Sequence, residues 1–225
     1  MQEKSVGILD ADVYGPSIPR MMNLEDEVPE VDEKNQMIPV TNYGIKCMSM
    51  GFLVRKDSAI IWRGLMVMQG IERLLRQVVW GPLDYLFVDM PPGTGDTQLS
   101  ISQNIPVSGS IIVTTPQQVS LMDASKAIVM YRKVNVPLFG LVLNMSHFEC
   151  DDCKKQHKLF GSSDACQSLC KEMDVTLLAE FPFDPAIIKS NDEGTSILSS
   201  LNPLTLDLYR RLATDVLSQL KQPLD

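Results

Sequence analysis

Long apolar runs, an excess of basic residues and recognisable targeting features are all missing from this sequence. No stretch is apolar over enough residues to span a lipid bilayer, which argues against a transmembrane protein. The first residues, Met-Gln-Glu-Lys-Ser, have the features of neither a signal peptide nor an Arg-rich transit peptide. Lys and Arg number 20 against 28 Asp and Glu, and this net charge of −8 argues against nucleic acid as the main partner.

Cysteine is also scarce, with five residues in the 225-residue chain, four of them within residues 150–170. An odd count in a chain of this size without a signal peptide is not typical of a secreted disulfide framework. The clustering instead favours metal binding or redox chemistry.

What is present is the composition of a globular chain that buries a core, 44% hydrophobic and 21% charged. Without internal repeats or low-complexity linkers, we expect one domain over residues 1–225, with an inserted metal loop at about residues 146–160. Residues 24–40 are acidic and predict a solvated loop, whereas residues 43–50 and 59–62 predict strands of a possible hairpin.

Elsewhere, short apolar runs alternate with amphipathic segments. This rhythm predicts βαβ units, hence an α/β fold with a mostly parallel sheet and helices on both faces. We expect strands at residues 6–10, 85–88, 109–115, 138–144 and 176–181, and helices at residues 65–79, 97–103, 120–134, 163–173 and 204–221, with a short helix from residue 186.

Acidic residues follow two of the predicted strands. Asp89 ends one strand and precedes a loop with two prolines and two glycines, and Asp10 and Asp12 end another before Gly and Pro. Carboxylates at the carboxyl edge of a parallel sheet, beside a Gly-rich loop, suit a Mg²⁺-phosphate site, because the hard cation takes oxygen ligands and loop N–H groups face phosphate oxygens. The alternative is that these acids only form turns and helix caps.

Cys150 and Cys153 form a C-x-x-C pair in a polar stretch, and both thiolates can reach one metal centre. The site needs two more ligands. A second copy of the chain would complete a [4Fe–4S] cluster across a two-fold axis. Alternatively, Cys166 and Cys170, four residues apart on one helix face, would complete an intrachain zinc site, and His147 or His157 would also serve.

Taken together, these features make the chain resemble the Mrp/nucleotide-binding-protein family of deviant P-loop ATPases, which assemble iron–sulphur clusters. The mitochondrial branch linked to respiratory complex I assembly is most similar. A partition- or division-type ATPase shares the acidic motifs but is disfavoured by the C-x-x-C pair. The matching segments span almost the whole chain in the family's order, namely Leu9-Asp-Ala-Asp-Val-Tyr-Gly-Pro-Ser17, Met48-Ser-Met-Gly-Phe-Leu-Val54, Trp62-Arg-Gly-Leu-Met-Val-Met68, Asp89-Met-Pro-Pro-Gly-Thr-Gly-Asp96, Gln103-Asn-Ile-Pro106, Thr114-Thr-Pro-Gln117 and Asn144-Met-Ser146.

The resemblance implies a role for each matched residue. Asp12 would position the attacking water, with Asp10 near Mg²⁺, and Asp89 would hold Mg²⁺ through water. Asn144 would hydrogen-bond adenine. Cys150 and Cys153 would bind half of a [4Fe–4S] cluster shared between two subunits. A loop sensing the γ-phosphate would comprise Gly93, Thr94, Gly95 and Asp96.

The resemblance also implies a homodimer that delivers clusters to iron–sulphur apoproteins, among them complex I subunits, in the mitochondrial matrix or alternatively the cytosol. One departure stands against the family pattern. Only nine residues precede Asp10, and they contain no Gly-rich phosphate loop with its lysine. We therefore expect the first strand, phosphate loop and helix to be lacking, and ATP binding and hydrolysis by this chain to be weak or absent.

Overall fold

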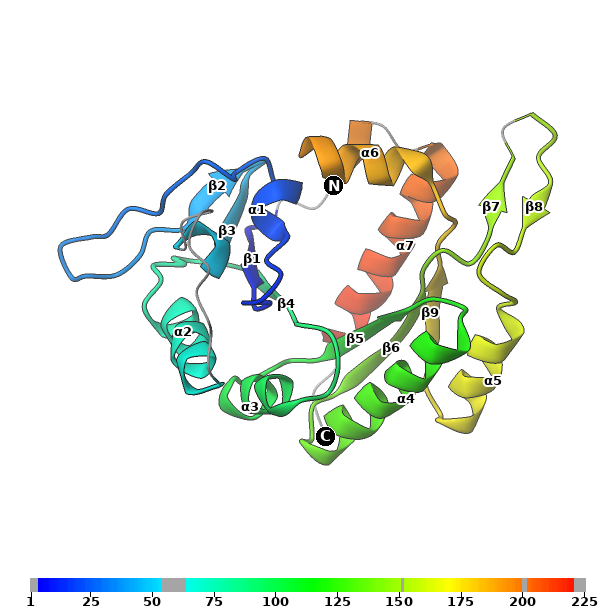
Figure 1. Cartoon of the computed structure of the whole chain (residues 1–225), viewed down its shortest axis with the longest axis horizontal. Coiled ribbons are helices and arrows are strands. Elements are labelled where there is room, and N and C mark those ends of the chain that lie inside the picture. Colours follow the sequence, from blue (N-terminus) through cyan, green and yellow to red (C-terminus); the bar gives the residue numbers. More distant parts are fainter. Residues whose placement is uncertain (1–3, 54–63, 151, 200–201, 221–225) are drawn as a thin grey trace. The chain divides into compact units, whose positions relative to one another are not determined.

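The computed structural model describes residues 4–53, 64–150, 152–199 and 202–220. The chain divides into two compact units, a first unit of Met1–Pro92 with Ile187–Ser199 and a second unit of Gly93–Ala186 with Ser200–Asp225. Each unit has its own sheet, mostly parallel in the first unit and parallel in the second (Figure 1). The single domain expected from the sequence stays a prediction.

The first unit is built on a sheet with the strand order β2-β3-β1-β4. β1 runs parallel to both β3 and β4, and β2 runs antiparallel to β3 at the edge. The register sets Asp10 opposite Ser49 on one side and Asp89 on the other, so three parallel strands end in a row of polar residues. The strands are β1 (Val6–Asp10), β2 (Val40–Asn42), β3 (Ile45–Ser49) and β4 (Tyr85–Asp89).

The core of the first unit is built mainly from apolar side chains. α2 (Gly64–Arg76) contributes Val67, Ile71 and Leu74 at helical spacing, and all three are buried, as are Leu9 and Met48 of the sheet. Burying each such side chain stabilises the fold by about 1.5–3 kcal/mol. The shorter helices of this unit are α1 (Ile18–Met21), the 3₁₀ turns η1 (Met50–Phe52) and η2 (Ile197–Ser199), and most of α6 (Pro185–Glu193).

The hairpin of the first unit differs from the prediction. β3 pairs with β2, which lies at the end of the stretch that we expected to be a solvated loop, and the turn between them is Tyr43-Gly44. Both turn residues have positive φ, the backbone twist that two-residue hairpin loops require. The predicted partner strand, residues 59–62, lies outside the described residues.

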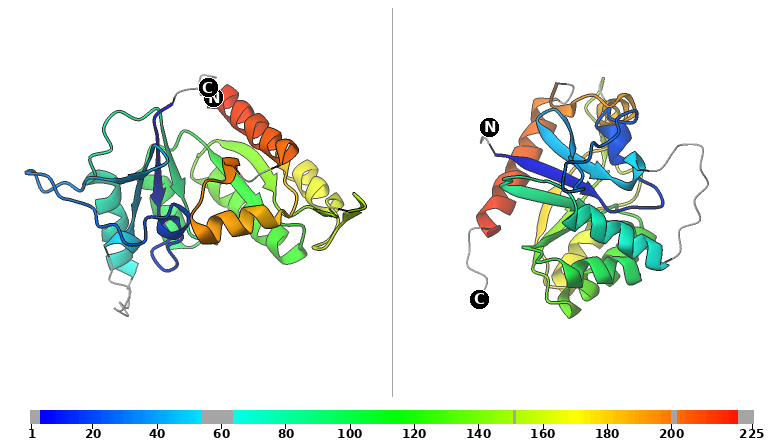
Figure 2. Two further views of the ribbon diagram at one scale, coloured as in Figure 1. Left: turned by 90° about the horizontal axis from the view of Figure 1, so that it is seen from above. Right: turned by 90° about the vertical axis from the view of Figure 1, so that its left-hand side faces the viewer.

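The second unit holds the sheet β5-β6-β9, all parallel. Figures 1 and 2 place α4 and α5 on one face of this sheet and α7 on the other. The helices on both faces match the fold class that the sequence predicted. The elements of the sandwich are β5 (Ser110–Thr114), α4 (Gln118–Lys133), β6 (Leu138–Leu143), α5 (Asp164–Glu172), β9 (Leu177–Glu180) and α7 (Pro203–Leu220), with α3 (Asp96–Asn104) preceding them.

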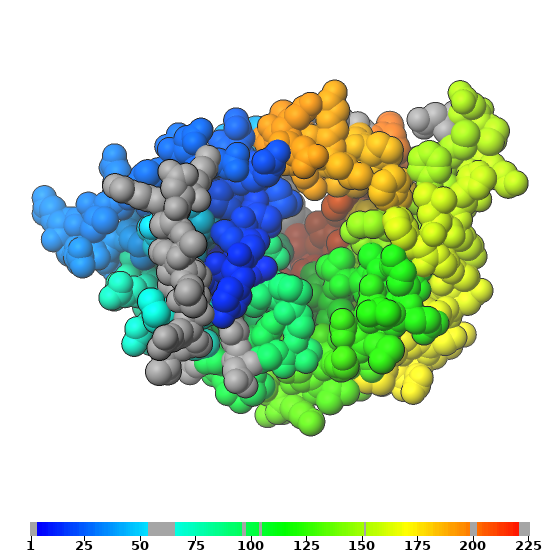
Figure 3. Space-filling view, viewed as in Figure 1, coloured from blue at the N-terminus to red at the C-terminus, as the bar shows by residue number. Residues whose placement is uncertain are grey.

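A two-stranded ribbon, β7 (Phe148–Glu149) with β8 (Gln156–His157), interrupts the βα rhythm where the sequence predicted an inserted loop. It projects from the second unit, as Figure 3 shows in yellow-green. None of the helices in the described part of the chain combines the length and apolarity needed to cross a membrane.

Candidate functional site

The carboxyl ends of β1, β3 and β4 gather three polar side chains. Asp10 is only 1% exposed, and its carboxylate is fully engaged. One oxygen accepts from the backbone N–H of Asp12 (3.1 Å), and the other from the N–H of Ile18 (3.2 Å) and the hydroxyl of Ser49 (3.1 Å). Asp10 therefore holds the loop that follows β1 in place.

Ser49 is a residue of this site that the sequence reasoning missed. It is fully buried, donates to Asp10 and accepts from the N–H of Gly51 (2.9 Å), so one hydroxyl joins β3 to β1 and begins the 3₁₀ turn. The available signal was a polar residue at the end of an apolar strand, as at Asp10 and Asp89.

Asp12 and Asp89 carry the remaining negative charge of this edge. One Asp12 oxygen accepts from the N–H groups of Tyr14 and Gly15, both at 3.1 Å. Desolvation raises the pKa of Asp89, and the Asp12 carboxylate raises it further. Burial likewise raises the pKa of Asp10, against the lowering effect of its hydrogen bonds. A cation would relieve this repulsion, although no three acidic, His or Cys side chains among the described residues lie close enough to form a ready metal cage.

The loop predicted to sense phosphate begins the second unit. Gly93 has φ +95°, a conformation that glycine adopts without strain, and Gly95 precedes the first residue of α3, Asp96. A side chain at Gly95 would approach the Gln98 amide to 3.3 Å, so the glycine leaves the helix N-terminus open. Thr94 is exposed.

Asn144 follows β6, where its backbone N–H donates to Thr114 at the end of β5 (2.7 Å). Its side-chain oxygen accepts from the N–H of Met145 (3.0 Å), which orients the amide group. Met145 has φ +53°, and this turn directs the chain out of the sheet and into the β7–β8 ribbon.

The C-x-x-C pair lies in the turn of the β7–β8 ribbon. The turn is closed by the Cys150 N–H donating to Lys155 (3.1 Å) and the Lys154 N–H donating to Cys150 (2.9 Å). Cys150 is half-buried and Cys153 is exposed, and neither is in a disulfide. The turn thus presents the Cys153 thiol to solvent, with the half-buried Cys150 three residues before it.

The base of the ribbon is fixed by aromatic packing. The ring of Phe183 lies 6.3 Å from Phe148 in an edge-on arrangement and 6.1 Å from Phe160. The N–H of Phe183 donates to His147 (2.7 Å), and the buried Ser146 hydroxyl donates to Phe181 (3.0 Å). The segment after β9 therefore anchors the ribbon to the sheet.

Cys166 and Cys170 do not join the C-x-x-C pair. They share one face of α5, as predicted, but that face packs into an apolar cluster with Ile112, Ile128 and Leu141. Burial raises the pKa of Cys166 to about 12, with Cys170 adding to the effect, and burial also raises the pKa of Cys170. Protonated thiols in an apolar core are poor zinc ligands, and no cluster of three metal-binding side chains occurs among the residues described.

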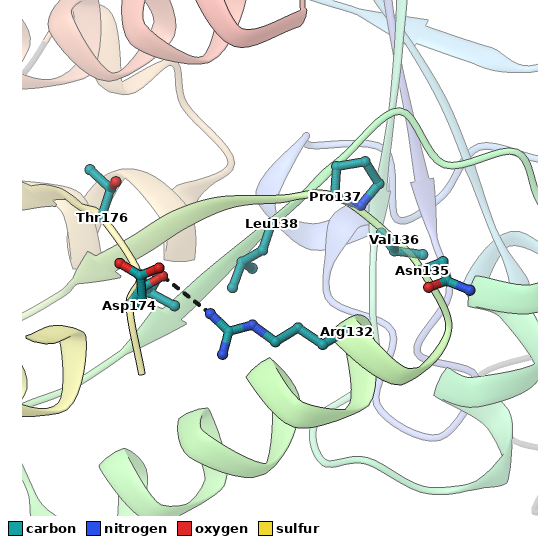
Figure 4. Close-up of a pocket in the computed structure, with 8 residues that line it drawn as sticks. Arg132, Asn135, Val136, Pro137, Leu138, Asp174 and Thr176 are labelled. Carbon is teal, nitrogen blue, oxygen red and sulfur yellow. Dashed lines mark hydrogen bonds between the residues drawn. The ribbon is translucent and has the colours of Figure 1, made fainter. Parts of the chain in front are cut away.

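A depression of about 450 Å³ lies at the amino-terminal ends of β6 and β9 (Figure 4), away from Asn144, which follows the carboxyl end of β6. The Arg132 guanidinium there donates to the carbonyl oxygens of Met173 and Asp174. These two hydrogen bonds cap the carboxyl end of α5, so the charge of Arg132 is already used by the fold, and we assign this depression no ligand.

This architecture, with parallel strands ending in acids and Gly-rich turns, is that of the P-loop NTPase class. MinD from Pyrococcus horikoshii, solved with Mg-ADP, superposes with a TM-score of 0.68 over 98% of this chain and 87% of that one, and at 18% identity it shows the fold alone. A nucleotide-binding protein from Archaeoglobus fulgidus, solved in complex with ADP, matches with a TM-score of 0.73 and 38% identity over 86% of this chain and 75% of that one.

Within that class, a family model described as "ParA: NUBPL iron-transfer P-loop NTPase" matches residues 1–217, and the chain belongs to this family. The mouse iron-sulfur cluster transfer protein NUBPL is 53% identical over 219 residues, which are 97% of this chain and 68% of the relative. An Arabidopsis thaliana relative, the mitochondrial iron-sulfur protein required for NADH dehydrogenase, is 48% identical over 98% of this chain and 70% of its own length.

Proposed function

We propose that this chain carries iron–sulphur clusters and delivers them to apoproteins. The observation that carries the proposal is the pair Cys150 and Cys153, held in the closed turn of a ribbon that projects from the second unit. Relatives that share about half of its residues are named for cluster transfer or as an iron–sulphur protein. Cysteine thiolates are the usual ligands of such clusters.

The cargo that fits this turn is a [4Fe–4S] cluster shared between two copies of the chain. Cys150 and Cys153 of one copy supply two of the four cluster ligands, and the same pair of the second copy in the homodimer supplies the other two. The alternative intrachain zinc site is disfavoured because Cys166 and Cys170 are buried in the core.

The recipients that we propose are iron–sulphur apoproteins, including subunits of respiratory complex I, in the mitochondrial matrix rather than the cytosol. The support is the Arabidopsis relative, which is named as mitochondrial and as required for NADH dehydrogenase.

Anaerobic reconstitution with iron and sulphide tests the cargo. We expect a brown dimer with about two irons per chain, since four irons are shared by two copies. Cys150→Ser and Cys153→Ser should each abolish the colour, whereas the matched control Cys166→Ala should keep it. A colourless protein with one zinc per chain would contradict the proposal.

For the nucleotide, we propose that Asp89 holds Mg²⁺ through water and that Asp12 positions the attacking water. Asp10 would hold the loop after β1 that carries Asp12. Gly93 to Asp96 would face the γ-phosphate and Asn144 the adenine. Because the chain contains no Gly-rich loop with lysine before Asp10, we expect these groups to bind ATP weakly.

A further inference from the structure

Helix α4 carries apolar side chains on two opposite faces. Its inner face, with Leu121 and Ile128, packs into the apolar core of the second unit. Its outer face carries Val119, Met122 and Val129, whose exposed fractions are 73%, 60% and 40%. A helix that covers one face of a sheet needs apolar residues only on its inner side. The core of the second unit therefore does not account for the three outer residues.

The exposed apolar residues belong to a single stripe along α4. Val119, Met122, Lys126, Val129 and Lys133 follow one another at steps of three or four residues, which brings them onto the same side of the helix. We call these five residues the outer stripe. The alkyl stems of the two lysines extend its apolar surface, while their ammonium groups reach solvent. In Figure 3, α4 lies at the surface of the second unit, in green.

The outer stripe is positively charged, although the whole chain has a net charge of −8. Lys126 lies 3.0 Å from Asp123, and both side chains are 61% exposed, so this ion pair contributes little and exchanges partners easily. Lys133 forms no ion pair with any residue in the described part of the chain. The neighbouring helix α5 exposes charges of both signs, at Asp164, Lys171 and Glu172. The charge of the stripe itself therefore favours an acidic ligand.

We propose that the outer stripe of α4 is a docking surface for an acidic amphipathic helix of a partner protein. The helical spacing of Val119, Met122 and Val129 fits the apolar face of a second helix, and acids on that helix would face Lys126 and Lys133. A second copy of α4 fits less well, because a two-fold axis at the centre of the stripe sets Lys126 against Lys126. The stripe contains no residue of the cysteine turn, so this inference does not depend on the cluster.

Two designed helical peptides test the charge preference. One carries leucines at positions i, i+3 and i+7 flanked by glutamates, and the other is identical except that lysines replace the glutamates. In titrations of the cluster-free 225-residue chain at low salt, followed by fluorescence anisotropy, we expect the Glu peptide to bind about tenfold more tightly than the Lys peptide. The double variant Lys126→Glu, Lys133→Glu should invert this preference.

The apolar contacts are tested with Met122→Glu, which should weaken binding of the Glu peptide about tenfold, because an apolar contact is lost and a like charge is added. Leu204→Glu is the matched control, since it makes the same kind of change at a 78% exposed position at the start of α7, and it should leave the affinity unchanged. In methyl NMR spectra of the chain with labelled methionines, the Met122 signal should shift on titration and that of the buried Met48 should not.

Several outcomes would overturn the proposal. They are no binding of either peptide, equal affinity for both peptides, or binding of the Glu peptide that survives Met122→Glu. Dimerisation of the cluster-free chain that Met122→Glu abolishes would also overturn it and would assign the stripe to a second copy. Because these measurements use protein without iron, their failure leaves the proposed cluster function standing, and failure of cluster uptake leaves the stripe proposal standing.

Discussion

Asp10 and Asp89 end neighbouring parallel strands in the same register, yet their surroundings give them different tasks. Asp10 is buried with three hydrogen-bond donors, whereas Asp89 is more exposed and faces the charge of Asp12. A carboxylate with a full set of protein donors stabilises a loop. A carboxylate whose pKa is raised by desolvation and by a neighbouring negative charge benefits from a cation.

We expect Asp10→Ala to lower the free energy of unfolding by about 2 kcal/mol, because the N–H groups of Asp12 and Ile18 lose their acceptor. Asp89→Ala should change it by less than about 0.5 kcal/mol, since its removal relieves repulsion. Urea unfolding at pH 7 measures both, and equal losses would contradict the different tasks.

Two buried thiols predict a loss of stability in alkali. Burial raises the pKa of Cys47 to about 11 and contributes most of the rise for Cys166, whose pKa is about 12. Above about pH 8.5 the unfolded chain loses these protons while the folded chain keeps them, so the free energy of unfolding falls as pH rises, by up to about 1.4 kcal/mol per pH unit for each thiol. The fall ends once the folded thiols themselves ionise.

Denaturation of the cluster-free chain at pH 7.5 and pH 10 measures this loss. Cys47→Ala should reduce the difference in the free energy of unfolding between pH 7.5 and pH 10 by the contribution of one thiol. The cavity left by the substitution lowers the stability equally at both pH values and does not affect this difference. An undiminished difference would show that Cys47 ionises in the folded state.

Among the elements, the β7–β8 ribbon depends most on contacts outside itself. It is only two residues long on each side, and an isolated ribbon of this length is unstable in water. Its rigidity comes from Phe183 and from the backbone hydrogen bonds to the segment after β9. The positions of Cys150 and Cys153 in the turn therefore depend on residues some 30 positions away in the sequence.

We expect Phe183→Ala to speed hydrogen exchange of the Cys150 and Lys154 amides about tenfold, because the lost ring contacts are each worth about 0.5–1.5 kcal/mol. Phe87→Ala, which alters an exposed ring in the first unit, is the matched control and should leave these amides unchanged. Normal exchange in the Phe183 variant would place the anchor elsewhere.

Periodicity predicted most of the described elements because their apolar faces are buried locally. β1, β4, β5, β6 and β9 all appear near their expected positions. The β2–β3 hairpin was missed because its turn, Tyr43-Gly44, lies inside a stretch interpreted as one strand, and a two-residue turn leaves little trace in the hydrophobic pattern. The spacing of Cys150 and Cys153 predicted a metal site, which stays a prediction, but it did not predict that the pair lies in the turn of a projecting ribbon.

At the scale of the whole chain, the acidic edge and the cysteine turn belong to different units. In the proposed function, cluster binding uses the turn of the second unit in two copies of the chain, whereas nucleotide binding by P-loop proteins uses a Gly-rich loop with lysine, which does not occur before Asp10 in this sequence. The cluster and nucleotide activities should therefore separate.

We expect isothermal titration of the pure 225-residue chain with Mg-ATP to show no micromolar binding, while the same preparation takes up about two irons per chain on reconstitution. The given sequence has no Gly-rich loop with lysine before Asp10, and such a loop supplies most of the contacts to the β- and γ-phosphates in P-loop proteins. Micromolar affinity would mean that Asp12, Asp89 and the loop at residues 93–96 hold nucleotide by themselves.

The sequence by itself determined the α/β class, the acids at the strand ends and the thiol pair, because these depend on residue types at short spacing. Only the tertiary structure decided which acids and thiols are available. Asp10 is buried and accepts hydrogen bonds from three donors, and Cys166 and Cys170 are packed in the core against α4. Asp89 and Cys153 are exposed. Burial depends on contacts between residues far apart in the chain, which local patterns do not specify.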